Sequence, residues 1–137
     1  MFDLGTLGGT FGFPTGLNNR GEVIGLSKLA GDQSADPFLW DGKELIDMFT
    51  AGTGGNFLDV QSIDDAGQVV GAASFPNRPF DAAIWKGRTV TDLGTLPGDC
   101  FSEAFVLNSK GQAAGSSSLY RASFRDFCFR IDRHRDL

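Results

Sequence analysis

Residues 3–9 read DLGTLGG, and nearly the same segment returns as DLGTLPG at residues 92–98. A weaker copy, DMFTAGTGG, occupies residues 47–55. The three segments begin 44 and then 45 residues apart, at positions 3, 47 and 92. A constant period of this length is typical of tandem supersecondary units. The sequence therefore predicts a single repeat domain over residues 1–137, with copies at about 3–46, 47–91 and 92–137.

The composition favours strands over helices within each copy. The chain contains 19 glycines and 13 phenylalanines among its 137 residues. Each glycine costs a helix interior about 1 kcal/mol relative to alanine, so few uninterrupted helical windows remain. Every copy divides instead into four short apolar segments separated by turn residues, a pattern typical of strands. We therefore predict an all-β fold built from tandem four-stranded antiparallel repeats.

Matching turns and glycines recur in the three copies. An Asx residue is followed by glycine three positions later, as in a turn that a left-handed residue closes; these Asx residues are Asn18, Asp64 and Asn108. A second glycine interrupts the strand that follows, where it usually indicates a bulge or a close backbone approach; these glycines are Gly25, Gly71 and Gly115. In the first copy, Asp41-Gly42 also predicts a two-residue hairpin turn.

Four strands in about 45 residues is the size of a β-propeller blade. Propellers typically have 4–8 blades, so three would form an open arc with uncovered faces and strand edges. Such an arc predicts self-association of the chain, or further repeats that complete the ring. The alternative is a β-trefoil, which also contains three four-stranded repeats but closes by itself.

The chain resembles the HAF repeat, a bacterial family named as a probable extracellular repeat. The resemblance rests on DLGTLGG followed by the LNNRG turn, GEVIG and FLWDG, and it extends over all three copies. It implies propeller-like or related β structure on a secreted or cell-surface protein, and it brings no established activity or catalytic residue. The histidine that gives the family its name is replaced by aspartate in each copy, at Asp36, Asp81 and Asp126.

Charge and hydropathy limit the kinds of partner that the chain is expected to bind. The net charge is −5, and no basic stripe provides the electrostatic footprint of nucleic-acid binding. No apolar run is long enough to span a membrane, and no signal peptide precedes the first repeat. We therefore expect neither a nucleic-acid partner nor a membrane span, and secretion rests on the family resemblance alone.

Few residues have the pattern of a catalytic or metal site. His134 is the only histidine, and its spacing from Cys100 and Cys128 is poor for zinc. The two cysteines could pair or remain buried thiols. The recurring Asx oxygens, together with Asp3, Asp47 and Asp92, could bind calcium, but capping of a recurring turn explains them better. The same capping role is expected for Asp36, Asp81 and Asp126. We identify no catalytic residue and no cofactor site.

The loops between the second and third strands vary between copies, at residues 28–35, 75–80 and 119–125. Ligand contacts often lie on variable loops over a rigid scaffold. The candidate ligand-contact residues in these loops are aromatic or basic; they are Phe75, Arg78, Tyr120 and Arg121. The alternative is ordinary loop variation, with phenylalanines packed under the sheet.

The sequence is best explained by a non-enzymatic extracellular repeat module that acts as a scaffold or binds a glycan or protein through its variable loops. The alternative is a propeller-type hydrolase or lyase acting on glycans, with its active site in a central channel completed by other blades. A catalytic pair of carboxylates should break the repeat symmetry, and none is visible in the sequence.

Overall fold

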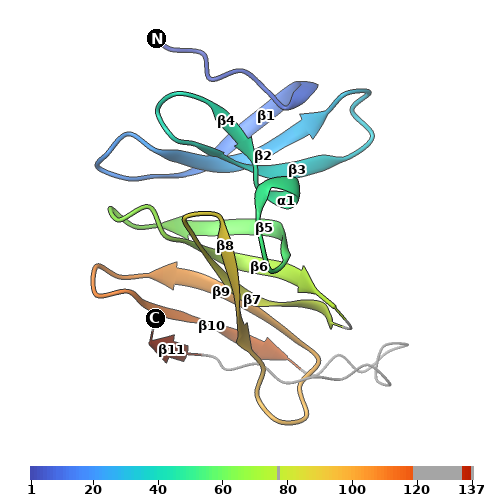
Figure 1. The fold of residues 1–137 in the computed structure, drawn as a ribbon, viewed down its shortest axis with the longest axis vertical. Helices are drawn as coiled ribbons and strands as arrows, with labels where there is room; N and C mark the ends of the chain where they lie inside the picture. The colour runs from blue at the N-terminus through green and yellow to red at the C-terminus, as the bar shows by residue number, and fades with distance from the viewer. Residues whose placement is uncertain (77, 119–133, 137) are drawn as a thin grey trace.

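The computed structural model describes residues 1–76, 78–118 and 134–136. Three antiparallel sheets lie one above the other along the long axis of the molecule (Figure 1). The first contains β1 (Gly8–Leu17), β2 (Val23–Leu29), β3 (Ala35–Trp40) and β4 (Leu45–Asp47). The second contains β5 (Asn56–Ile63), β6 (Val69–Phe75), β7 (Arg78–Lys86) and β8 (Thr89–Gly94). The third contains β9 (Phe101–Leu107), β10 (Gln112–Ser118) and β11 (His134–Asp136). The short helix α1 (Met48–Ala51) joins the first two sheets.

The strand order confirms the all-β prediction. In the first two sheets the strands follow one another in space as they do along the chain, so each sheet is an up-and-down meander. The strands of the third sheet lie in the order β11-β10-β9. A β-trefoil would pair strands from different repeats in a shared barrel. The described strands form three separate sheets, each of strands consecutive along the chain, and no closed barrel, so the trefoil alternative is wrong.

Two apolar cores lie between the sheets. The first core joins sheets one and two and includes Met48, Phe57 and Trp85. The rings of Phe57 and Trp85 meet edge to face, with their centroids 6.1 Å apart. The second joins sheets two and three and includes Val70, Leu93 and Ala113. Each sheet is too thin to bury an apolar face alone, so stacking neighbouring repeats creates the cores.

The recurring Asx residues cap their own turns, as the sequence predicts. The side-chain oxygen of Asn18 accepts the N–H groups of Arg20 at 3.0 Å and Glu22 at 2.9 Å. Asp64 and Asn108 accept the corresponding N–H groups of their turns at 2.8–3.0 Å. The glycine that closes each turn has φ between 79° and 84°. Because these oxygens are engaged with backbone donors, turn geometry accounts for their recurrence.

The predicted two-residue hairpin at Asp41-Gly42 is wrong. Trp40 pairs with Leu45, so the turn contains four residues, 41–44. The Asp41 carboxylate accepts the N–H groups of Lys43 at 2.8 Å and Glu44 at 2.9 Å, and this local bonding favours the longer turn. The second copy has a two-residue turn at Gly87-Arg88, where both residues have positive φ.

Candidate functional site

The first strand of every sheet carries a β-bulge at the same repeat position. The pairing of β5 with β6 skips Gln61, and the pairing of β9 with β10 skips Phe105. In β1 the skipped residue is Thr15. A bulge bends its strand and re-aims the side chains beside it. The three first strands thus present matching positions that the ladder does not constrain.

The interrupting glycine of the second strand makes this bulge sterically feasible. A Cβ on Gly71 would lie 1.9 Å from the carbonyl oxygen of Asp59, and one on Gly115 would lie 1.9 Å from that of Glu103. These distances confirm the close backbone approach predicted from the sequence. The glycines therefore fix the backbone that carries Asp59 and Glu103.

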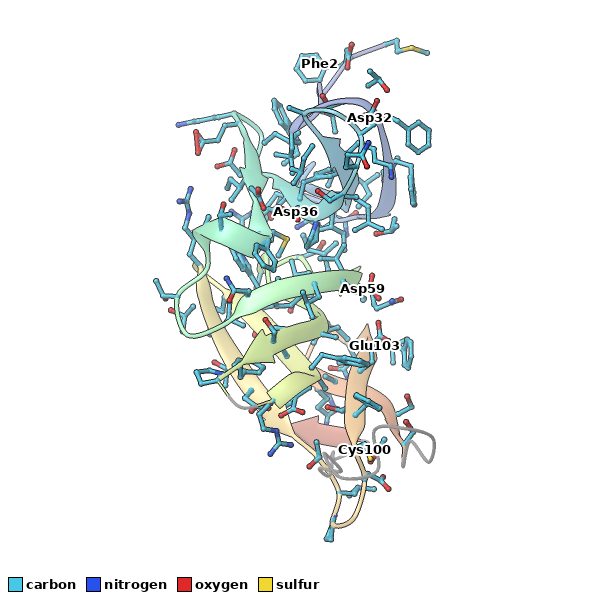
Figure 2. The ribbon with its side chains drawn as sticks, turned by 90° about the vertical axis from the view of Figure 1, so that its right-hand side faces the viewer. Phe2, Asp32, Asp36, Asp59, Cys100 and Glu103 are labelled. Carbon is cyan, nitrogen blue, oxygen red and sulfur yellow. The ribbon has the colours of Figure 1, made fainter. Side chains whose placement is uncertain are left out.

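Asp59 and Glu103 meet across the boundary between the second and third sheets. Both project from the same side of the molecule, Asp59 from β5 and Glu103 from β9 (Figure 2). The bulged residue, Gln61, donates from Nε2 to Asp59 Oδ2 at 2.7 Å and to Glu103 Oε2 at 2.9 Å. One amide group therefore holds both carboxyl groups in register.

The carboxyl pair retains a proton close to neutral pH. Burial, a hydrogen bond that the protonated Glu103 carboxyl donates to Asp59, and the negative charge of Asp59 together raise the pKa of Glu103 to about 7. The hydrogen bond from Gln61 acts in the opposite direction, because it stabilises the ionised form of the Glu103 carboxyl and so lowers its pKa. Two carboxyls in direct contact cannot both ionise without repulsion, so the pair shares one proton.

Exposed aromatic residues hold matching positions on the first strands of the neighbouring sheets. Phe13 occupies on β1 the position that Asp59 and Glu103 occupy on β5 and β9, and it is 44% exposed. Phe105 takes the bulge position of Gln61 on β9 and is 40% exposed. At these matching positions the second sheet has two polar residues, and the first and third sheets each have one phenylalanine. We call these residues the first-strand array; they are Phe13, Thr15, Asp59, Gln61, Glu103 and Phe105.

The spacing of the pair limits its chemistry. Glycoside hydrolases hold their two carboxyl groups about 5–5.5 Å apart for retention and about 6.5–9.5 Å apart for inversion. The Asp59 and Glu103 carboxyl groups bond to one amide nitrogen at 2.7 and 2.9 Å, so these two oxygens lie closer together than inversion requires. Their geometry instead offers a donor, several acceptors and one shared proton to hydroxyl groups of a ligand.

Asp36 and Asp81 do not cap turns, contrary to the expectation from sequence. Both lie within third strands, and each forms a carboxyl pair with an aspartate of the neighbouring fourth strand, Asp47 and Asp92 respectively. Burial, followed by the neighbouring aspartate, raises the pKa of Asp36 to about 6 and that of Asp81 to about 7. Asp126 lies outside the described residues.

Asp47 and Asp92 do cap the backbone, as predicted, and Asp3 does the same. Each accepts the N–H group two residues further on, at 3.0, 2.8 and 2.8 Å respectively. Among the described residues no group of three or more His, Cys, Asp or Glu side chains is placed to hold a metal ion. Calcium binding therefore stays a prediction without a candidate ligand set.

The structure places two of the predicted ligand-contact residues in intramolecular contacts. Phe75 is the last residue of β6 and packs against the first core. Arg78 Nε lies 3.0 Å from Asp81 Oδ2, and Arg78 Nη2 donates to Asp81 Oδ1 at 3.2 Å and to Thr95 Oγ1 at 3.1 Å. Only residues 76 and 77 separate β6 from β7, so the predicted loop is short. Tyr120 and Arg121 lie outside the described residues, as does Cys128, the other half of the pairing suggested for the buried Cys100.

We expect Arg78→Gln to lower the free energy of unfolding by about 2 kcal/mol, because Asp81 is fully buried and loses a charged donor. Arg88→Gln is the matched control, since Arg88 and its partner Glu44 are 50% and 63% exposed, and we expect a change of less than about 0.5 kcal/mol. Urea unfolding of both variants measures the difference. Equal effects would show that Arg78 does not support the buried carboxyl pair.

A cleft opens between the second and third Asx turns, although the first and second turns are fastened together. Asn19 donates its backbone N–H and its side-chain amide to the Asp65 carboxylate, both at 2.8 Å, and Asn18 Nδ2 donates to the Asp64 carbonyl at 2.9 Å. The next turn has Asp64 and Asp65 at these positions, and a carboxylate has no amide N–H to donate. A cleft of about 500 Å³ lies there, lined among others by Lys86 and Lys110.

Sequence reasoning missed the carboxyl pair of the first-strand array. Its members belong to different sheets, and only the fold places Asp59 beside Glu103. One signal was present: equivalent positions of the three copies hold Phe13, Asp59 and Glu103, so the repeat symmetry is broken there. Recognising it required alignment of the first strands at their bulges.

Comparison with protein-family models, with curated proteins and with solved structures finds no match to this chain. Within the described part of the chain no helix is long and apolar enough to cross a membrane.

Proposed function

We propose that this chain is a non-enzymatic binding module, in which the stacked sheets are propeller-like blades and the first-strand array contacts a glycan. The observation that carries the proposal is the array itself: a carboxyl pair and an amide, held by bulges and glycines, with exposed phenylalanines at the matching positions of the first and third sheets. Sugars present hydroxyl groups to polar side chains and apolar C–H faces to aromatic rings. The resemblance to HAF repeats supports a secreted or cell-surface location for such a module.

The array is suited to binding because its geometry is set before a ligand arrives. Gln61 bonds to both carboxyls, and the carbonyl groups of Asp59 and Glu103 are pressed against glycines of the neighbouring strand. Pre-organised groups lose little conformational freedom when a ligand binds. The role proposed from sequence for variable loops is therefore assigned to the first strands.

A glycan-acting hydrolase or lyase is the second candidate, and one observation favours it. The pKa of Glu103, raised to about 7, makes this carboxyl a proton donor near neutral pH, as a general acid requires. The Gln61 amide brings the two carboxyls closer together than inversion requires, and it engages both of them before any ligand is bound. Binding therefore fits the geometry better than hydrolysis.

Affinity electrophoresis in gels containing dissolved xylan, β-glucan or starch tests the proposal. We expect at least one polysaccharide to retard the chain, and we expect Phe105→Ala to weaken that binding about tenfold, which corresponds to about 1.4 kcal/mol for a stacking ring. Val106→Ala is the control, because Val106 is exposed but lies outside the array.

Migration unaffected by all three polysaccharides would reject glycan binding by the array. Incubation of the same polysaccharides with the chain tests the second candidate. Release of reducing ends, or of unsaturated products at 235 nm, that disappears in Glu103→Gln would establish an enzyme instead of a binding module.

A further inference from the structure

The outward face of the first sheet has residues whose equivalents in the second and third sheets are covered by the preceding sheet. Trp85 and Val69 of the second sheet are 1% and 0% exposed because the first sheet packs on them. Their equivalents in the first sheet are Trp40 and Val23, which are only half-buried. The same face of the first sheet therefore has the residues of an interface without a neighbouring sheet.

The end of the first strand shows the contrast most clearly. Ile63 packs against the first core, and its Cγ2 would lie 3.6 Å from a Cβ on Gly16 of the first sheet. Leu107, the equivalent residue of the third sheet, packs against the second core. Leu17 holds this position in the first sheet and is 69% exposed. The position thus makes inter-sheet contacts wherever a preceding sheet is present.

The N-terminal segment provides an independent indication. Its Asp3-Leu4 matches Asp47-Met48 and Asp92-Leu93. Met48 and Leu93 are 0% and 4% exposed, and each is buried in a core between two sheets.

Leu4 is only half-buried, and Phe2, 71% exposed, contacts Trp40 with ring centroids 5.6 Å apart. The segment and the sheet together enclose an apolar groove of about 890 Å³, which Leu17, Phe38 and Trp40 help to line. Leu4 therefore lies where its equivalents are buried between two sheets, but only the first sheet is present to cover it.

We propose that the outward face of the first sheet, together with residues 1–5, binds the third sheet of a second copy of this chain, head to tail. A copy of the chain is the occupant that fits, because sheets of the same repeat already cover the equivalent residues twice within the molecule. A head-to-tail contact joins two different surfaces and closes into a ring when its rotation permits. Two copies supply six sheets, within the range of 4–8 blades found in closed propellers.

Sedimentation velocity at a series of concentrations tests the contact. We expect the wild-type chain to form dimers and Leu17→Asp to raise the dimer dissociation constant about tenfold or more, because it introduces a charge at a buried contact. Leu58→Asp is the control: Leu58 is 37% exposed on β5 of the second sheet, which takes no part in the proposed contact, and this variant should dimerise like the wild type. Circular dichroism should show the same fold for all three chains.

A mixture of wild-type and Leu17→Asp chains distinguishes the arrangements. In a head-to-tail dimer, the wild-type face can still bind the third sheet of the variant, so mixed dimers form through one interface. In a symmetric face-to-face dimer every mixed contact contains the substituted residue, and the mixture contains only wild-type dimers. A wild-type chain that stays monomeric at all concentrations, a Leu17→Asp chain that dimerises normally, or a face-to-face result would overturn the proposal.

Discussion

Replacing Gly71 with alanine is expected to lower the free energy of unfolding by about 3 kcal/mol, the upper end of the usual cost of overpacking, because the new methyl group would meet backbone atoms. The new methyl group would lie 1.9 Å from the Asp59 carbonyl oxygen and 3.1 Å from the Val60 Cα. Neither neighbour is a flexible side-chain end, so strands β5 and β6 would have to separate. Because Asp59 is on the displaced strand, the variant should also lose the hydrogen bonds of Gln61.

Gly12→Ala provides the matched control for this substitution. Gly12 also lies in a strand with an ordinary φ, but the nearest atom to its new Cβ would be the Leu26 carbonyl oxygen at 3.3 Å. We expect a change of less than about 1 kcal/mol, because the unfolded chain also loses freedom when glycine is replaced. Urea unfolding followed by tryptophan fluorescence measures both variants. A Gly71→Ala chain as stable as Gly12→Ala would show that the bulge does not need this glycine.

The chain should be more stable at pH 5 than at pH 8. The pKa values of Asp36, Asp81 and Glu103 are raised in the folded state to about 6, 7 and 7, so the folded chain binds more protons than the unfolded chain between about pH 4 and 7. Their contribution to stability is complete below the unfolded pKa values and is lost as the pH rises through the folded ones. We expect a loss of roughly 3 kcal/mol, or a fall in Tm of about 10 °C.

Other carboxylates set the acid limit of this stability. Hydrogen bonds from backbone N–H groups lower the pKa values of Asp32, Asp41 and Asp65. Their contribution is present above the unfolded pKa and is lost as the pH falls through the folded values, so the optimum should lie near pH 4–5. Thermal unfolding from pH 3 to pH 9 measures the profile. Glu103→Gln should flatten its descent above pH 5, whereas a wild-type profile that rises towards pH 8 would show that the carboxyl pairs are not protonated in the folded chain.

Most of the architecture follows from periodic residues. The Asx residue and the two glycines of each copy predict a capped turn and a close strand approach, and both appear in all three copies. These structural requirements are local, because every copy needs a left-handed residue in its turn and a residue without Cβ in its second strand. A sequence period therefore reports them directly.

Side-chain partners across strands could not be predicted in this way. Asp36 and Asp81 recur with the period, and recurrence alone cannot distinguish a turn cap from a buried carboxyl pair. The distinction depends on Asp47 and Asp92, eleven positions later in each copy, which the third and fourth strands bring alongside. Asp59 and Glu103 depend on the stacking of two sheets, which is a further step away from local sequence.

The hairpin at Asp41-Gly42 shows how one side chain changes a local outcome. The sequence pair favours a two-residue turn, but the Asp41 carboxylate bonds to two N–H groups and stabilises a wider one. In the second copy Lys86 occupies the aspartate position, and the tight turn forms there instead.

The two boundaries between the sheets are fastened unequally. The first Asx turn has asparagines that donate to the second turn, whereas the second turn has aspartates at the same positions. The joint between sheets one and two is locked by Asn18 and Asn19, whereas that between sheets two and three has acids where those donors would be. Flexing of the stack should therefore concentrate at the second joint, where Asp59 and Glu103 also meet. Gln61 bonds to both of these carboxyl groups across the boundary, so its single amide would limit such flexing where the turn donors are missing.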